Sequence, residues 1–208
     1  MRATIGWALV VILPLTPVAG RAHTAEPTAA SRALATRLAA SGRAEAALVQ
    51  VVPDPLGGPA DERRGRVAIE NPDRVRLDYT NGESVALRGD GGEWLQPRLQ
   101  QMLVFDAAGA GAANRAWDLL LGRDDSMTVR AAGGSTWRLV PKREQIGLPD
   151  SVEVALDPAG LPRRLTAWVG GERTVEFRIS GWRFLQSRGR GAFVLAAPRG
   201  FEVIRTGP

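Results

Sequence analysis

A succession of short β-strand patterns separated by tight turns most limits what this chain can fold into. Val75, Leu77 and Tyr79 alternate with charged residues, which is the period of two expected for a strand with one buried face. Asn81-Gly82 suits the positive φ angles of a hairpin turn, and an Asp-Gly-Gly turn follows it. The stretch Gly65–Trp94 therefore predicts three short strands in an antiparallel meander with one apolar face.

The same rhythm continues through most of the chain, at a spacing of about eight to twelve residues. Further strands are predicted over residues 44–52, 99–105, 127–132, 136–141, 151–157, 161–168 and 174–182, and a final strand pair over 192–196 and 202–204. Strands and helices do not alternate as in a parallel α/β protein. The predicted fold class is α+β: a strongly curved antiparallel sheet of about ten or eleven strands, forming an incomplete β-barrel.

Two segments predict short helices. Residues 29–41 place Leu34 and Leu38 one turn apart among alanines, and Gly42 follows as a stop signal. Residues 115–121 give a second helix, which Gly122 closes. We expect two to three short helices to form a lid over an apolar cavity.

The N-terminus has the pattern of a cleavable secretory signal. Arg2 precedes the apolar run Ile5–Val18, and small residues follow it. A retained membrane anchor is the alternative, but the run is short for a bilayer span of about 20 residues. We therefore expect a signal peptide over residues 1–22, a single exported domain over residues 23–208, and a periplasmic location.

Composition excludes several kinds of chemistry. The chain has no cysteine, and its single histidine, His23, lies beside the expected cleavage point. Thiolate chemistry, a histidine-based triad and a histidine metal site therefore lack their residues. The acidic pairs Asp61-Glu62 and Asp124-Asp125 fit solvated loops better than a catalytic site. We predict no enzyme, no catalytic residue, no metal and no cofactor.

The basic residues do not indicate a nucleic-acid surface. The formal net charge is +5, but arginines are spread along the chain and alternate with acidic residues. We expect a monomer that does not bind nucleic acid.

The apolar residues carry the functional information. Six tryptophans are present, of which Trp7 lies in the expected signal. The others could simply fill a core. A strongly curved sheet, however, has an inner face too wide for its own side chains to fill, and therefore tends to enclose a cavity. In an exported protein without catalytic groups, such a cavity indicates a hydrophobic ligand.

An ordered set of residues resembles one known family over the whole mature region. The set comprises Gln50, Gly65, Pro72, Tyr79, Asp90-Gly91, Trp94, Pro97, the segment Trp137–Lys142, and Phe193 followed by Pro198, Gly200 and Val203-Ile204. The chain resembles the periplasmic outer-membrane lipoprotein carrier family, LolA.

This resemblance implies a cavity that holds the acyl chains of lipoproteins. It also implies two partners, namely an inner-membrane lipoprotein-releasing ABC transporter that supplies the cargo and an outer-membrane lipoprotein receptor that accepts it. The receptor shares the fold but is anchored through a lipidated cysteine, so the lack of cysteine favours the carrier. The expected lining residues are Leu34, Leu38, Leu77, Tyr79, Trp94, Met102, Val104, Trp117 and Leu120.

The sequence also departs from the family pattern. Asn71 stands where the family carries an arginine that is implied to latch the lid, and Ala44 and Leu48 stand where phenylalanine is usual. Asparagine is shorter and uncharged, so we expect a roomier and more weakly latched cavity. Two alternatives stay open: a carrier of another lipid or glycolipid, and a periplasmic lipid-sensing regulatory domain of the same fold.

Overall fold

The main feature of the structure is one sheet of twelve strands. A computed structural model describes residues 29–107, 127–142 and 149–206. Within these ranges the elements are α1 (Ala29–Ser41), β1 (Arg43–Val52), β2 (Asp61–Glu70), β3 (Arg74–Tyr79), β4 (Ser84–Arg88), β5 (Gly91–Gln96), the 3-10 turn η1 (Pro97–Leu99), β6 (Gln101–Asp106), β7 (Met127–Ala131), β8 (Thr136–Pro141), β9 (Ser151–Leu156), β10 (Pro162–Val169), β11 (Glu172–Leu185), the 3-10 turn η2 (Arg190–Phe193) and β12 (Glu202–Thr206).

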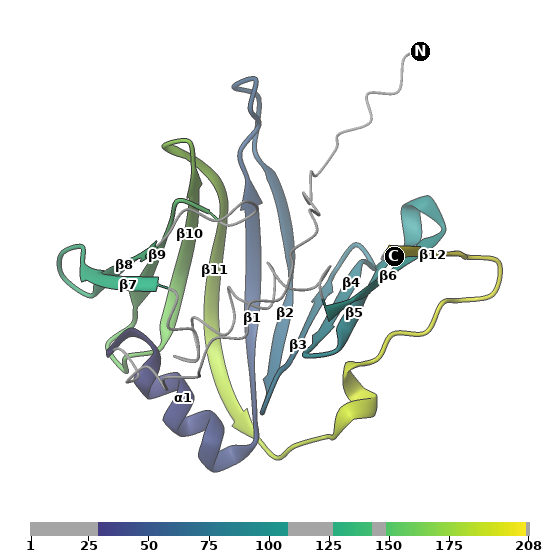
Figure 1. The fold of residues 1–208 in the computed structure, drawn as a ribbon, viewed down its shortest axis with the longest axis horizontal. Coiled ribbons are helices and arrows are strands. Elements are labelled where there is room, and N and C mark those ends of the chain that lie inside the picture. The colour runs from purple at the N-terminus through teal and green to yellow at the C-terminus, as the bar shows by residue number, and fades with distance from the viewer. Residues whose placement is uncertain (1–28, 108–126, 143–148, 207–208) are drawn as a thin grey trace.

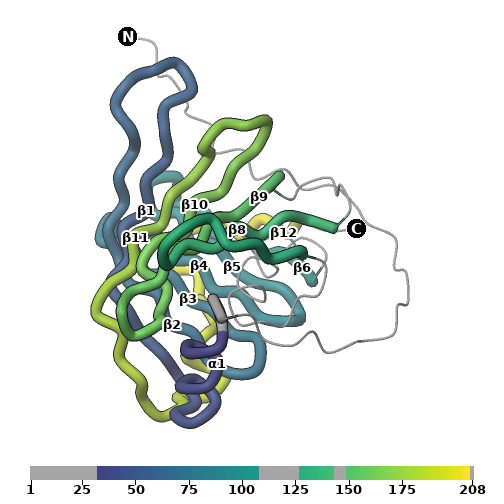
Figure 2. The backbone as a smooth tube through the Cα atoms, turned by 90° about the vertical axis from the view of Figure 1, so that its left-hand side faces the viewer, coloured from purple at the N-terminus to yellow at the C-terminus, as the bar shows by residue number. Residues whose placement is uncertain are grey.

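The strands lie in the order β12-β6-β5-β4-β3-β2-β1-β11-β10-β9-β8-β7. Figure 1 shows β1 and β11 at the centre of the sheet, and Figure 2 shows both of its ends reaching toward the same side. The predicted strongly curved sheet is thus confirmed. The long strands β1 and β11 pair near the middle of the sheet, because the chain returns to β1 only after the β7–β10 meander.

Three details of the predicted fold class are wrong. The sheet has twelve strands, and it is mixed, because β12 pairs with β6 in parallel. Residues 192–196 do not form a strand; they belong to η2 and the extended segment after it. A parallel partner needs a long crossover rather than a hairpin, and β6 and β12 are indeed separated in the sequence by β7 to β11 and the segment that follows them.

The expected set of two to three helices is not supported. Among the described residues α1 is the one α-helix, and η1 and η2 are single 3-10 turns. The helix predicted over residues 115–121 lies outside the described residues. Helix α1 ends as expected, because Gly42 has a φ of 91° and its N–H donates to the carbonyl of Leu38 at 2.8 Å.

Residues 186–201, which we call the strap, lie against part of one side of the sheet, around β3–β6. The backbone of η2 packs against β3 and β4. Phe193 is 1% exposed, and Leu195 joins a small buried cluster with Ala86 and Met102. This cluster is separate from the main core, which lies on the opposite side of the sheet. The sheet therefore has two differently covered faces.

Candidate functional site on the inner face of the sheet

We call the side of the sheet that carries α1 and the main core the inner face, and the other side the outer face. Strand pairing defines the inner face residue by residue, because directly opposed residues point to the same side. Leu77 is opposite Val85, Val85 is opposite Trp94, and Trp94 is opposite Leu103. These four residues form one row across β3–β6.

Helix α1 closes one end of the inner face. It packs against β1, β9, β10 and β11. Leu34 and Leu38 are fully buried, and they belong to the same cluster as Leu48 and Leu77. The two helix leucines are therefore part of a filled core at this end, and a ligand would reach them only if α1 moved.

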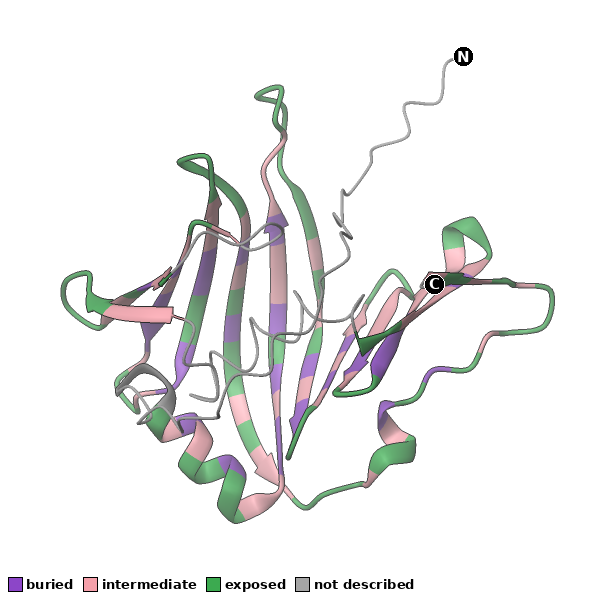
Figure 3. Cartoon of the chain, viewed as in Figure 1, coloured by how far each residue is buried: buried purple, intermediate pink, exposed green. Residues whose placement is uncertain are grey.

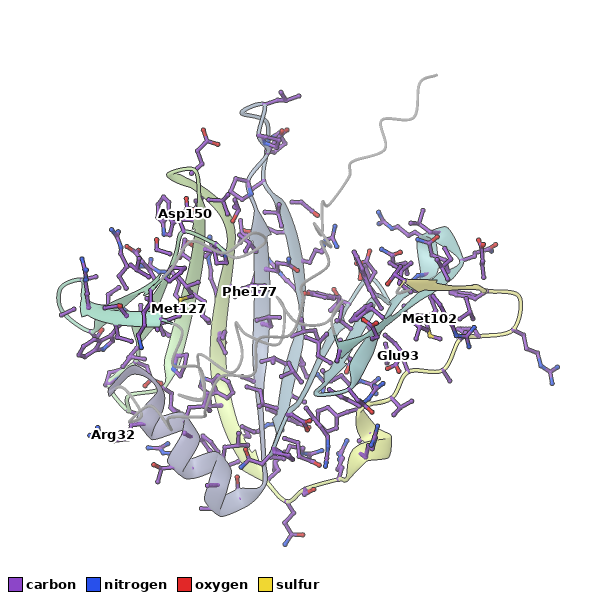
Figure 4. The ribbon with its side chains drawn as sticks, in the orientation of Figure 1. Arg32, Glu93, Met102, Met127, Asp150 and Phe177 are labelled. Atoms are coloured by element: carbon purple, nitrogen blue, oxygen red, sulfur yellow. The ribbon has the colours of Figure 1, made fainter. Side chains whose placement is uncertain are left out.

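Much of the rest of the inner face is half-buried. The partly buried hydrophobic residues packed against the main core are Ala33, Tyr79, Val85, Phe105, Met127, Val129, Trp137, Phe177, Trp182 and Phe184. Figure 3 shows intermediate burial at many places along the strands, and Figure 4 labels Phe177 near the centre of the sheet and Met127 near one end. An apolar surface that spans the sheet and is only half covered by its own chain is a candidate binding surface.

The predicted lining residues of β5 and β6 do not all share this face. Trp94 lies on the inner face, but Met102 is opposite Leu95 and Val104 is opposite Glu93. Met102 and Val104 therefore point to the outer face, where they pack with Ala86 and Leu195. The error is one residue of register, which moves a side chain to the other side of a sheet.

The inner-face positions on β6 are Leu103 and Phe105. Both were missed, because residues 102–105 are all apolar and alternation alone does not choose a face. The turn between β5 and β6 makes the choice, since it pairs Gln96 with Gln101 and so sets Leu103 opposite Trp94. Two further predicted residues, Trp117 and Leu120, lie outside the described residues.

Tyr79 brings a polar group into this apolar surface. It lies opposite Gly65, and a Cβ at Gly65 would come 2.2 Å from the carbonyl oxygen of Asp78 and 2.9 Å from Cα of Tyr79. The tyrosine hydroxyl donates to Oε1 of Gln50 at 2.6 Å. Burial raises the pKa of Tyr79, so the hydroxyl stays protonated and remains a donor.

Asn71, the predicted latch position, lies at the end of α1. Its backbone N–H donates to the carbonyl of Gly42 at 3.3 Å, and the Asn71–Pro72 peptide bond is cis. The residue is thus placed where the lid helix meets β2. Its role as a latch stays a prediction.

Two grooves among the described residues have polar linings. One, of about 470 Å³, includes Arg66 and Arg188, and the other, of about 420 Å³, includes Arg63 and Glu83. Neither has the character of an acyl-chain cavity, so the apolar cavity expected from the sequence stays a prediction. The described part of the chain holds no group of three potential metal ligands. It also contains no helix long and apolar enough to cross a membrane.

Comparisons with known proteins bear on the fold. No family model matches the sequence, and no curated protein matches it. Among solved structures, an uncharacterized conserved protein from Thermus thermophilus is 14% identical and has a TM-score of 0.51; the match covers 86% of this chain and 100% of that one. At this identity the similarity concerns the fold alone.

Two weaker similarities carry family names. A LolA superfamily protein from Nitrosomonas europaea is 7% identical, with 79% of this chain and 97% of that chain covered and a TM-score of 0.42. A DUF1329 family protein from Desulfovibrio piger is 10% identical, with 75% and 91% covered and a TM-score of 0.45. At these identities and TM-scores neither similarity assigns a family, and the functional argument rests on the residues of this chain.

Proposed function

We propose that this protein is a periplasmic carrier that binds the acyl chains of lipoproteins on the inner face of its sheet. The observation that carries the proposal is the half-buried apolar surface that includes Val85, Phe105 and Phe177. A curved sheet of this kind offers a concave surface on which flexible chains can lie. The predicted signal peptide over residues 1–22 supports export.

The energetics favour a surface that is only partly enclosed. Transfer of acyl chain out of water contributes about 0.8 kcal/mol per CH₂, so one long chain fully sequestered gives on the order of 10 kcal/mol. A carrier must also release its cargo. Side chains that stay half-buried before binding, such as Phe177 and Val129, provide contact without the depth of a closed cavity.

The partners follow from the same proposal. Cargo would come from an inner-membrane lipoprotein-releasing ABC transporter and pass to an outer-membrane lipoprotein receptor. The protein would act by reversible binding and not as an enzyme. Asn71 would be a weak latch, because its side chain is shorter than that of arginine and uncharged. Its backbone N–H bonds the carbonyl of Gly42, which places it beside the end of α1.

The test is to purify the protein from the periplasm of its native host and to identify bound molecules by mass spectrometry. We expect triacylated lipoproteins. Recovery of a free glycolipid or another lipid would favour the alternative carrier, and recovery of no apolar molecule would contradict both.

A matched pair of variants makes this test specific to the inner face. Val129 is half-buried and faces inward on β7, whereas its neighbour Thr128 faces outward. Val129→Glu should lower the amount of bound cargo several-fold, since it puts a charge against the acyl chains. Thr128→Glu should leave it unchanged. Equal losses in the two variants would contradict binding at this face.

A further inference from the structure

A row of polar side chains lies on the inner face where β1, β3 and β5 end and where β2, β4 and β6 begin. We call this row the polar rim. The rim consists of Gln50, Arg63, Tyr79, Glu83, Gln96 and Gln101. Strand pairing places Gln50 opposite Arg63 and Gln96 opposite Gln101, and the N–H of Tyr79 bonds the carbonyl of Glu83. The rim therefore borders the half-buried apolar surface along several neighbouring strands.

Hydrogen bonds between strands hold the rim together. Tyr79 donates to Oε1 of Gln50 at 2.6 Å, and Nε2 of Gln101 donates to Oε1 of Gln96 at 2.5 Å. Arg63 reaches Oε2 of Glu83 at 2.9 Å. These bonds fix the positions of the side chains before any ligand arrives, which lowers the entropy cost of binding.

The same bonds leave N–H donors that can serve a ligand. The bonds of Gln50 and Gln96 described above use only Oε1 as an acceptor, so the two amide nitrogens are not engaged in them and can donate. Nε1 of Trp94, two residues before Gln96 on the same face of β5, is buried and has no partner among the described residues. Buried polar groups are normally hydrogen-bonded, so this N–H indicates a missing acceptor.

The surroundings divide sharply into apolar and polar regions. Below the rim the inner face presents Leu77, Trp94 and Leu103. Beside the rim, the groove of about 420 Å³ that includes Arg63 and Glu83 is lined by charged and polar residues, Thr80 and Asn81 among them. An amphiphile lying on this surface would have its chains below the rim and its water-soluble part beside it.

We propose that the polar rim binds the carbonyl oxygens where the acyl chains of a lipid join its head. Ester and amide carbonyls are acceptors only, which matches the N–H donors of Gln50, Gln96 and Trp94. This inference rests on the proposed function, since it concerns the head end of the same ligand.

The test compares two lipids that differ only in these carbonyls. Diheptanoyl phosphatidylcholine and its diheptyl ether analogue, both kept below their critical micelle concentrations, are titrated into the full chain by calorimetry. We expect the ester lipid to bind about five- to tenfold more tightly, the effect of one or two hydrogen bonds. Equal affinities would overturn the role of the rim and leave the carrier function standing, whereas binding of neither lipid would overturn both.

Variants assign the preference to particular donors. Trp94→Phe combined with Gln96→Met removes two of the three donors, so it should bind the ether lipid as the wild type does and lose most of the preference for the ester lipid. Trp168→Phe is the control, because Nε1 of Trp168 is also buried without a partner but the residue pairs with Ser151 on the outer face. An ester preference as large in the double variant as in the wild type, or the loss of the preference in Trp168→Phe, would contradict the assignment.

Discussion

The two faces of the sheet at β3–β6 are covered in different ways. On the outer face the strap buries Leu195 against Ala86 and Met102, and its Phe193 is 1% exposed. On the inner face Val85 and Phe105 remain half-buried. Both faces keep some half-buried apolar side chains, since Leu95 and Val104 on the outer face are also partly buried. The difference is that the strap packs on the outer face at β3 and β4, whereas the half-buried apolar residues of the inner face continue across the sheet to β7.

Polar contacts add to this contrast. Arg76 donates to the carbonyl of Ala192 at 2.9 Å, and Arg88 donates to the carbonyl of Phe193 at 2.7 Å. Arg88 also forms a paired contact with Glu93, at 2.6 Å for both bonds. The outer face thus has ion pairs and hydrogen bonds that hold the strap in place, whereas the polar side chains on the inner face of β1–β6 gather at the rim.

The largest expected effect comes from opening the outer face. Phe193→Ala removes a ring that is 1% exposed and should lower the free energy of unfolding by about 3 to 5 kcal/mol. Chemical denaturation measures it. Val194→Ala is the control, because Val194 is 44% exposed and should change stability by no more than about 0.5 kcal/mol. Similar losses in both variants would contradict the view that the strap is a packed part of the core.

The next effect concerns the anchor at the start of the strap. Glu70 is buried and accepts hydrogen bonds from the N–H groups of Arg188 and Gly189, at 2.7 and 3.1 Å, and it pairs with Arg74. Glu70→Gln should lower the free energy of unfolding by about 2 kcal/mol, because the neutral amide replaces one acceptor oxygen with an NH2 donor that faces the N–H groups of the strap. Thermal or denaturant unfolding at pH 7 measures the loss.

The same anchor should depend on pH. Burial alone would raise the pKa of Glu70, but hydrogen bonds from the strap and the charge of Arg74 outweigh it and lower the pKa below its ordinary value of 4.5. The stability that ionised Glu70 contributes to the folded state is therefore present above pH 4.5 and is lost as the pH falls through the lowered folded-state pKa. The gap in stability between wild type and Glu70→Gln should narrow below pH 4.5, and a gap that widens there would refute the assignment.

A smaller loss of stability is expected at Gly65, which lies opposite Tyr79 on the inner face. Gly65→Ala places a Cβ against the backbone of Asp78 and Tyr79, so it should destabilise the fold by about 1 to 2 kcal/mol and displace the tyrosine hydroxyl from Gln50. Gly191→Ala in the strap is the control, because its Cβ would meet no atom within 4 Å. Denaturation measures the loss of stability, and tyrosine fluorescence reports the displacement of the Tyr79 ring. Equal stability and fluorescence in the two variants would contradict the close contact between Gly65 and Tyr79.

The smallest effect is expected at the latch position. Asn71→Arg should slow the release of bound lipoprotein about threefold, the effect of roughly one added hydrogen bond between β2 and the end of α1. A release assay with a lipoprotein acceptor measures the rate. Unchanged retention would show that this position does not control the helix.

The segments that form strands and the position of α1 were largely predictable from the sequence, because both depend on local patterns. The alternation of Val75, Leu77 and Tyr79 and the stop at Gly42 predicted β3 and the end of α1. These signals are periodicity and turn chemistry, which act between near neighbours in the chain.

Features that depend on distant residues were not predictable in the same way. The register between β5 and β6 decides whether Leu103 or Val104 faces inward, and both are apolar. The parallel pairing of β12 with β6 and the burial of Phe193 depend on the path of the strap over the outer face. The polar rim was missed because its residues come together only through the pairing of several strands.

The central claim, that lipid binds to the inner face, can be tested with one pair of labelled proteins. The chain has no cysteine of its own, so Leu103→Cys and Val104→Cys each give a single site for an environment-sensitive fluorophore on neighbouring residues of opposite faces. On addition of diheptanoyl phosphatidylcholine we expect a blue shift of the label at residue 103 and no shift at residue 104. A shift at residue 104 alone, or no shift at either residue, would contradict the account.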